Sequence, residues 1–361
     1  MDRRSFLTKT ALGGAAAAGA SALAAPAYAQ GKRTLTMVTT WGRGLAGVHD
    51  AAQRVADSIT AMTDGELTVD LKAAGELVGA FEVFDAVTAG QADMYHAADY
   101  YFVGQHPAYA FFTSVPFGMT AQELMNWYHH AGGMQLHDEL GEIFGLKSFL
   151  AGNTGAQAGG WFNKEITSPD DFKGLKFRMP GLGGKALGKL GASVQNLPGG
   201  EVYQALASGA IDGTEWIGPW ADEKAGFQEI TKIYYTAGFH EPGAGLSLAT
   251  NRDVFDSLSP AHQKVIEIAS AETHQWNLAQ FLANNGTALQ RLASSGVKVL
   301  EFPDSVWDAM GDASAEVHAE NLDDEFYAKV FDSYSSSMVS SSDWITKSES
   351  AYRAQRDRVL G

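Results

Sequence analysis

Three polar residues of this sequence lie in segments otherwise built of apolar or small residues, where an unpaired polar group is costly. Arg178 is near the end of an apolar run, Glu215 directly precedes a tryptophan, and Gln157 lies in a Gly-rich run. A guanidinium can hold a carboxylate through two parallel hydrogen bonds. The carboxylate of Glu215 needs either Arg178 or a bound cation as its partner. These residues predict a site for an organic acid, because an acidic protein needs a local positive group to hold an anion.

Each of these residues also has a purely structural interpretation. Arg178 and Glu215 can place their charges in solvent, and the amide of Gln157 can bond to nearby backbone. If they share a site, the carboxylate of Glu215 and the amide oxygen of Gln157 are hard oxygen ligands. Such ligands favour Na⁺ or Ca²⁺ rather than zinc.

Two other motifs give weaker signals. The Gly-rich run 181–184 lies between a predicted strand and a predicted helix, as a dinucleotide-binding loop does. The acidic residue that such a loop requires would be Glu201, which opens a helix instead of ending a strand, so nucleotide binding is disfavoured. The helix start beside Arg178 still favours a small anion. His129 and His130 are adjacent on a predicted helix and point in different directions, so we interpret them as packing or surface residues.

A repeated unit indicates which elements position these residues. Residues 83–93 and 202–212 match in register, and each predicts an amphipathic helix ended by glycine and followed by a strand. The first unit runs into Tyr100 and Tyr101, and the second runs into Glu215. The repeat favours two similar α/β lobes that deliver polar and aromatic groups to one cleft, although many α/β domains contain such units.

Along the rest of the chain, segments with the apolar spacing of helices alternate with segments that have the apolar pattern of strands, which is typical of an α/β fold. Further helices are expected in residues 307–360, separated by the Ser-rich stretch 333–342. No low-complexity linker divides the chain, so crossing strands rather than one hinge are expected to join the lobes. The predicted strands are 35–40, 67–71, 146–150, 175–179 and 193–197, and the predicted helices are 48–61, 121–144, 185–190 and 260–294.

The beginning of the chain and its composition limit the function. Residues 1–29 predict a twin-arginine signal peptide, from an Arg pair, a mild Ala/Gly-rich run and an Ala-Tyr-Ala end, with an ordinary secretory leader as the alternative. The net charge of −16 disfavours nucleic acid and anionic membranes as partners. The absence of cysteine excludes disulfides and thiol catalysis. No later apolar run is long enough to span a bilayer, so we do not expect a membrane-embedded protein.

Four segments together show a family resemblance: residues 153–162, 175–178, 199–203 and 212–219. The chain resembles the extracytoplasmic solute receptors of tripartite ATP-independent periplasmic (TRAP) transporters, and among them those for pyruvate, other 2-oxo acids and lactate. The resemblance implies a two-lobed periplasmic receptor fold with a ligand cleft between the lobes and a helical C-terminal extension. Lobe 1 is expected at about 30–150 plus part of the C-terminal half, lobe 2 at about 151–250, and the tail at about 305–361.

The resemblance also implies roles for individual residues. Arg178 would bind the substrate carboxylate, and a Na⁺ or Ca²⁺ ion would bridge the protein and the substrate. The departures from the pyruvate receptors are Phe239 and His240, where two tryptophans are expected, and Pro242. Those departures leave the organic acid open. The implied cation ligands are Gln157, Glu215, the carbonyl of Trp216 and Glu241, and the implied substrate contacts are Arg178, Gln157, Tyr100, Tyr101 and Asn153.

The expected function is therefore a periplasmic receptor, not an enzyme. It would bind a small monocarboxylate, such as the 2-oxo acid pyruvate or the 2-hydroxy acid lactate, and deliver it to the small and large membrane subunits of a TRAP transporter. A homodimer through the C-terminal helices is one possibility, and simple packing of the tail is the other. The alternative functions are an exported, cofactor-free enzyme or a sensor that acts on small organic acids.

Overall fold

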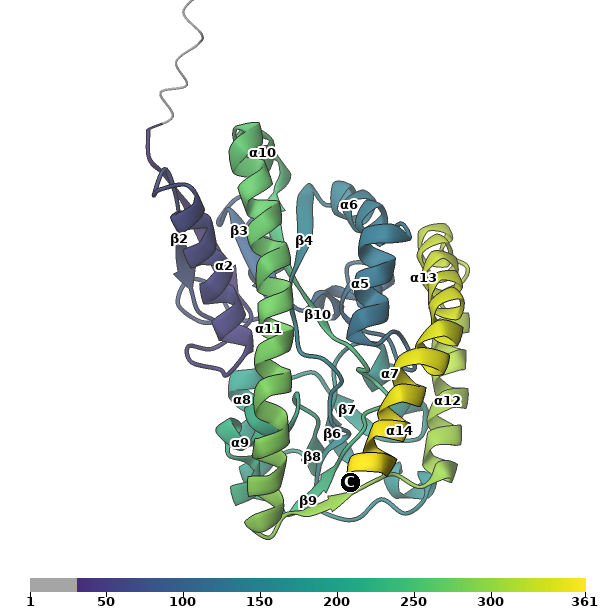
Figure 1. The fold of residues 1–361 in the computed structure, drawn as a ribbon. Helices are drawn as coiled ribbons and strands as arrows, with labels where there is room; N and C mark the ends of the chain where they lie inside the picture. Colours follow the sequence, from purple (N-terminus) through teal and green to yellow (C-terminus); the bar gives the residue numbers. More distant parts are fainter. Residues whose placement is uncertain (1–30) are drawn as a thin grey trace, which may run out of the picture.

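Two separate sheets form from strands that alternate with helices along the chain (Figure 1). The computed structural model describes residues 31–361, so the predicted signal peptide 1–29 lies outside the described residues. The first sheet has the strand order β2-β1-β3-β10-β4, in which β10 is antiparallel to both of its neighbours. Its strands are β1 (Arg33–Thr39), β2 (Leu67–Lys72), β3 (Met94–Ala97), β4 (Leu146–Asn153) and β10 (Gly245–Asn251).

The second sheet has the order β11-β9-β5-β8-β6-β7. We call the first sheet with its helices lobe 1 and the second sheet with its helices lobe 2, and this confirms the predicted two-lobed α/β class. The second sheet consists of β5 (Gly160–Phe162), β6 (Lys176–Arg178), β7 (Ser193–Gln195), β8 (Gly213–Thr214), β9 (Ile233–Tyr235) and β11 (Lys298–Leu300).

Most helices pack against one of the two sheets, and the chain also contains short 3₁₀ turns such as η1 (Asp99–Phe102). The α-helices of lobe 1 include α2 (Val48–Met62), α3 (Val83–Thr88), α4 (Ala110–Thr113), α5 (Ala121–His130), α6 (Gly133–Ile143) and α10 (Arg252–Asp256). Those of lobe 2 include α7 (Gly181–Lys189), α8 (Gly199–Ala207) and α9 (Pro219–Ala225).

The repeated unit has the predicted structure in both lobes. Helix α3 leads through a turn to β3, and helix α8 leads through a turn to β8. The two turns contain Gly90 and Gly209, with φ of 73° and 72°. A side chain at this φ would clash with its own backbone, which explains why both units end in glycine.

Three connections join the lobes near their centre. The segments between β4 and β5 and between β9 and β10 cross from one sheet to the other. The third connection is helix α11 (Pro260–Ser294), which contacts α2 and β4 in lobe 1 and α9 in lobe 2. In Figure 1 it runs along the full height of both lobes. The predicted joining by crossing strands is therefore right, and one long helix braces the same junction.

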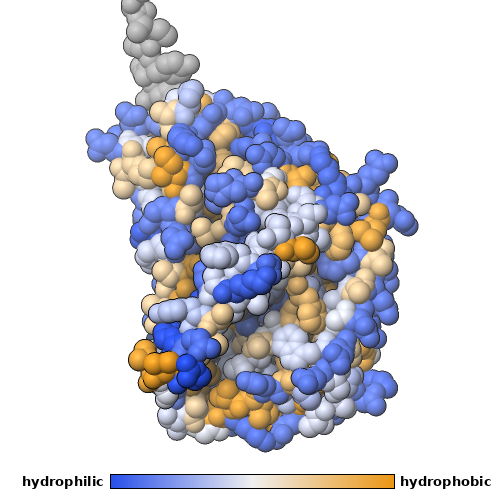
Figure 2. Space-filling model, turned by 45° about the vertical axis from the view of Figure 1, so that its right-hand side comes forward, coloured by the Kyte–Doolittle hydropathy of each residue, from blue (hydrophilic) through white to orange (hydrophobic). Residues whose placement is uncertain are grey.

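The tail returns from lobe 2 to lobe 1. Helix α12 (Asp304–Ala319) packs on α7, and α13 (Glu325–Ile345) packs on α5 and α6. A π-helical turn (Thr346–Ser350) leads into the last helix, α14 (Ala351–Leu360). No helix of the described residues is both long and apolar enough to cross a membrane. The face in Figure 2 is largely hydrophilic, with hydrophobic residues in small separate groups.

Three predicted elements are wrong in detail. The predicted helix 121–144 is two helices, because Gly132 adopts a φ of 96° between α5 and α6. The Ser-rich stretch 333–342 does not separate helices but lies inside α13, where several serine hydroxyls bond to carbonyls three or four residues earlier. The Gly-rich run 181–184 is not a loop before a helix: it forms the first turn of α7.

Candidate functional site

A small cavity lies at the junction of the lobes, where the connecting segments cross. It is lined by residues of both lobes and of both crossings. Five of the residues predicted for the site line it: Tyr100, Tyr101, Gln157, Trp216 and Glu241. Thr154, Trp41 and Thr113 also line it and were missed, because each lies in a segment whose pattern only indicates a strand, turn or helix.

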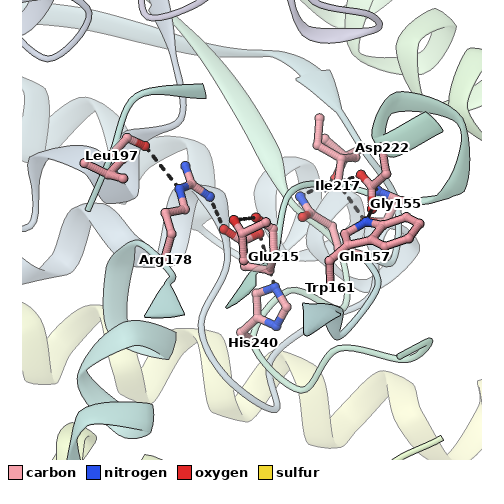
Figure 3. A network of polar contacts seen from close by, with 12 residues as sticks. Gly155, Gln157, Trp161, Arg178, Leu197, Glu215, Ile217, Asp222 and His240 are labelled. Carbon is pink, nitrogen blue, oxygen red and sulfur yellow. Dashed lines mark hydrogen bonds and ion pairs between the residues drawn. The ribbon is translucent and has the colours of Figure 1, made fainter. Parts of the chain in front are cut away.

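Arg178 and Glu215 form a buried ion pair beside this cavity (Figure 3). Both side chains are about 0% exposed, which excludes the interpretation that their charges reach solvent. Nη1 of Arg178 donates to Oε1 of Glu215, and Nε donates to the carbonyl of Leu197 at 3.1 Å. Nη2 is 3.4 Å from the hydroxyl of Tyr101, which lines the cavity. Burial opposes the charged guanidinium, but the neighbouring Glu215 raises the pKa of Arg178 overall.

Arg178 owes its position to adjacent strands. It ends β6, whose parallel neighbour β8 places Thr214 opposite Arg178, and Glu215 follows directly. The guanidinium carbon also lies 5.5 Å from the ring centroid of Trp216. Arg178 therefore contacts a carboxylate, a carbonyl, a tyrosine hydroxyl and an indole ring, which fix the direction of its fork.

Several oxygen atoms beside the pair are buried without a hydrogen-bond partner among the described residues. They are Oε1 of Gln157, Oε2 of Glu215 and both carboxylate oxygens of Glu241. Gln157 uses its other amide atom to donate to Thr154 at 3.0 Å, so its oxygen is left over. Buried oxygens without donors are costly, and a hard cation such as Na⁺ or Ca²⁺ satisfies such oxygens. The residues present thus fit a cation of the predicted kind.

The carboxyl group of Glu241 adds a strong electrostatic signal. The side chain is 2% exposed, and burial together with the nearby Glu215 raises its pKa well above the usual range. Two carboxylates in one dry site repel each other unless a positive charge lies between them. Such clusters of shifted groups are typical of functional sites.

The segment Glu215–Gly218 is held in place by hydrogen bonds to the side chain of Asp222. The backbone amides of Ile217 and Gly218 donate to Oδ1 of Asp222 at 3.0 and 2.9 Å, and the indole of Trp161 donates to Oδ2 at 3.0 Å (Figure 3). Asp222 belongs to none of the motifs found in the sequence, so its role was not predicted. It fixes the loop that contains both Glu215 and Trp216.

Glycines allow the same loop to pack closely. A Cβ on Gly199 would lie 2.1 Å from the ring of Trp216, and a Cβ on Gly160 would lie 2.4 Å from the carbonyl of Thr214. Gly160 also has a φ of 113°, which disfavours other residues. Gly199 thus leaves room for the indole of Trp216.

The remaining predicted residues lie at different places. Asn153, at the end of β4, is buried but does not line the cavity, and its Oδ1 accepts from the amide of Gly155 at 2.7 Å. His129 and His130 are exposed on α5, as predicted. His240 was noted only as a departure from the family, yet its Nε2 lies 3.4 Å from Oε2 of Glu215. Its position next to Glu241 was the available signal.

Known proteins are similar to this chain in both sequence and fold. The profile of the bacterial extracellular solute-binding proteins of family 7, DctP, matches residues 40–325. A monocarboxylate 2-oxoacid-binding periplasmic protein from Nostoc sp. is 41% identical over 299 residues, which are 82% of each chain.

Two solved structures have the same fold as the described chain. A TRAP periplasmic solute-binding protein from Pseudoalteromonas atlantica, with bound sodium and pyruvate, is 39% identical with a TM-score of 0.87, covering 90% of this chain and 99% of its own. Its counterpart from Colwellia psychrerythraea, with bound calcium and pyruvate, is 36% identical with the same TM-score of 0.87 and the same coverage of 90% and 99%. The predicted family is confirmed: this chain belongs to the DctP family, the solute-binding proteins of TRAP transporters.

Proposed function

We propose that this protein is the periplasmic receptor that binds a small monocarboxylate, a 2-oxo acid such as pyruvate or a 2-hydroxy acid such as lactate, and delivers it to the membrane subunits of a TRAP transporter. The observation that supports it most is the buried pair of Arg178 and Glu215 beside a cavity at the lobe junction. A buried guanidinium with a fixed fork suits one carboxylate. The relative from Nostoc is a 2-oxoacid-binding protein, and the structures from Pseudoalteromonas and Colwellia contain pyruvate. The ligand proposed for this protein belongs to the same chemical class.

A cation would complete the site. We assign Na⁺ or Ca²⁺ to the oxygens of Gln157, Glu215 and Glu241 and to the carbonyl of Trp216. The ion would neutralise the two carboxylates and attract the carboxylate and 2-oxygen of the substrate. Bound sodium and calcium in the two solved relatives support this assignment. Tyr100 and Tyr101 would contact the substrate from lobe 1. Asn153 would act indirectly, because it does not line the cavity and its Oδ1 accepts a hydrogen bond from the amide of Gly155.

The two lobes would close over the substrate, with the limits expected from the sequence: about 30–150 plus part of the C-terminal half for lobe 1, about 151–250 for lobe 2, and a tail at about 305–361. Export by the twin-arginine route would place the protein in the periplasm. We also propose a homodimer through the end of the tail. Trp344 near the end of α13 and Tyr352, Val359 and Leu360 on α14 are between 65% and 81% exposed, an unusual set of large apolar residues for exposed helix surfaces.

Calorimetric titration with a panel of acids tests the receptor function. Pyruvate and lactate should bind with a Kd of about 1 μM or below. Succinate should bind far more weakly, because its second carboxylate has no positive partner. After overnight incubation, chromatography should recover the 2-oxo acid unchanged. Turnover would instead support an enzyme, and the absence of binding to any monocarboxylate would refute the proposal.

A further inference from the structure

His240 places a nitrogen donor within the proposed cation site. Glu215, His240 and Glu241 each offer one donor atom, and these atoms lie within 4.8 Å of one another. All three side chains are at most 2% exposed. Among the described residues, neither ring nitrogen of His240 has a hydrogen-bond partner. Figure 3 shows the imidazole pointing at the carboxylate of Glu215. Nε2 of His240 makes only the 3.4 Å contact with Oε2 of Glu215, and Nδ1 has no hydrogen bond within the described chain, so this buried imidazole beside the unbonded carboxylate oxygens of Glu241 indicates that a ligand binds there.

Two glycines make room for the ring. A Cβ on Gly238 would lie 2.6 Å from Cε1 and 2.8 Å from Nδ1 of His240, and a Cβ on Gly183 would lie 2.7 Å from its Cβ. The ring of His240 therefore fits because Gly238 lacks a side chain, and its Cβ fits because Gly183 does. Such close packing fixes the orientation of the imidazole, as the surroundings of metal-binding histidines commonly do.

We propose that His240 is a ligand of the cation and that this site binds Zn²⁺ and related transition-metal dications more tightly than Ca²⁺ or Na⁺. The inference rests on the proposed function, because it concerns the same cation site. Imidazole nitrogen suits Zn²⁺, Ni²⁺ and Cu²⁺, whereas carboxylate and carbonyl oxygens alone suit Ca²⁺. The preference for Na⁺ or Ca²⁺ expected from Gln157 and Glu215 thus changes once His240 is included.

Charge balance also favours a dication. With Arg178, a divalent ion, two carboxylates and a monocarboxylate ligand, the positive and negative charges cancel, whereas Na⁺ leaves an uncompensated negative charge in a dry site. Donors about 2.1 Å from a tetrahedral zinc ion lie about 3.4 Å apart. The donor atoms of the cluster lie within 4.8 Å of one another, so their separations shorten by up to about 1.4 Å when the ion binds.

Metal titrations without organic acid test this inference. Tag-free protein is stripped with chelator, and its affinities for Zn²⁺ and Ca²⁺ are measured by competition with chromophoric chelators. The variant is His240→Gln, which keeps an oxygen donor for Ca²⁺. The control is His130→Gln, which removes an exposed histidine of α5 far from the cluster in sequence. Pyruvate binding in the presence of Ca²⁺ is measured on the same three proteins by calorimetry.

We expect His240→Gln to weaken Zn²⁺ binding at least about tenfold and to change Ca²⁺ binding less than about threefold, with His130→Gln like the wild type. Equal Zn²⁺ affinities of wild type and His240→Gln overturn this inference, while Ca²⁺-dependent pyruvate binding leaves the receptor function standing. If pyruvate does not bind the wild type with any ion, the receptor function itself is overturned.

A measurement on the wild type alone covers the case in which His240→Gln does not fold. One equivalent of Cu²⁺ is added to stripped protein, and its electron paramagnetic resonance spectrum is recorded. Nitrogen coupling from one imidazole is expected, and it should persist in His130→Gln. A spectrum with oxygen ligands only overturns the inference.

Discussion

At the scale of single residues, Arg178 and Glu215 neutralise each other where water is excluded. Removing one partner of such a pair leaves the other charge buried, which typically costs about 3–5 kcal/mol of stability. The guanidinium of Arg178 is held in a fixed orientation beside the cavity, and together with the proposed cation it would offset the charge of an organic anion. For Arg178, a substitution that keeps the charge is therefore the informative one.

Arg178→Lys should weaken pyruvate binding at least about tenfold while the protein stays folded, because lysine keeps the ion pair and loses the bidentate geometry. Calorimetry gives the affinity and circular dichroism the folding. Arg291→Lys is the matched control, since Arg291 pairs with Glu223 on the surface. An unchanged affinity of Arg178→Lys would exclude Arg178 as the carboxylate partner.

Individual residues differ in how well the sequence predicted them. Arg178, Glu215 and Gln157 were visible because each is polar within an apolar or small-residue segment. Trp216 and Glu241 followed only from the family resemblance, and their roles stay predictions. The role of Asp222 could not be predicted from the sequence. Its carboxylate oxygens accept hydrogen bonds only because the fold brings α9 against the loop that contains Glu215. His240 lies in the segment between β9 and β10 that crosses from one lobe to the other, and this crossing brings it next to Glu215. No local sequence pattern predicts that position.

At the scale of elements, the loop after β8 is held by two neighbours: Asp222 at the start of α9 and Gly199 at the start of α8. The sequence predicted the helices and strands around this loop well, since hydrophobic periodicity and glycine stops determine them locally. It predicted poorly where local signals were ambiguous. Gly132 divides one predicted helix, and buried packing against lobe 1 keeps the Ser-rich stretch helical despite its composition.

Gly199→Ala should destabilise the protein by about 1–3 kcal/mol, because the new methyl group would overlap the ring of Trp216. Pyruvate affinity should fall with it, since the indole adjoins the cavity. Gly200→Ala is the control: a Cβ added there would have no atom within 4 Å, and alanine should be neutral or stabilising in this helix. Chemical denaturation measures both variants. Equal stabilities would show that Gly199 is not a packing constraint.

Asp222 should make stability depend on pH. Burial, despite the three hydrogen bonds it accepts, raises its pKa to about 7. A folded-state pKa above the unfolded value means that this contribution is complete below about pH 4 and is lost as the pH rises towards 7. The free energy of unfolding of wild type relative to Asp222→Asn should therefore fall by up to about 1.4 kcal/mol per pH unit in that window. Parallel stability curves of the two proteins between pH 4 and 8 would contradict this pKa.

At the scale of the whole molecule, three connections, α11 among them, hold the lobes around one junction, and the tail ties lobe 2 back to lobe 1. This arrangement suits limited closing movements about the crossings, because α11 contacts both lobes. The repeated unit predicted two lobes, but the path of the tail depends on long-range packing of α12 and α13 and was not predicted.

The end of the tail gives a prediction about assembly. Wild-type protein should be a dimer in light scattering, and Tyr352→Glu with Val359→Glu should shift it towards monomer, because both exposed residues lie seven positions apart on one face of α14. Pyruvate affinity should stay unchanged, since α14 is not part of the cavity. A monomeric wild type would refute this role of the tail.

Cation dependence of pyruvate binding tests the central claim most directly. Pyruvate is titrated calorimetrically into chelator-stripped protein, then into the same protein with Ca²⁺ restored, and into Glu215→Gln under both conditions. The account predicts a Kd of about 1 μM or below with the ion, at least about tenfold weaker binding without it, and a much smaller effect of the ion in Glu215→Gln. Equal affinity of the stripped and restored wild-type protein, with Glu215→Gln binding normally, would contradict the claim that a cation bridges the protein and its substrate.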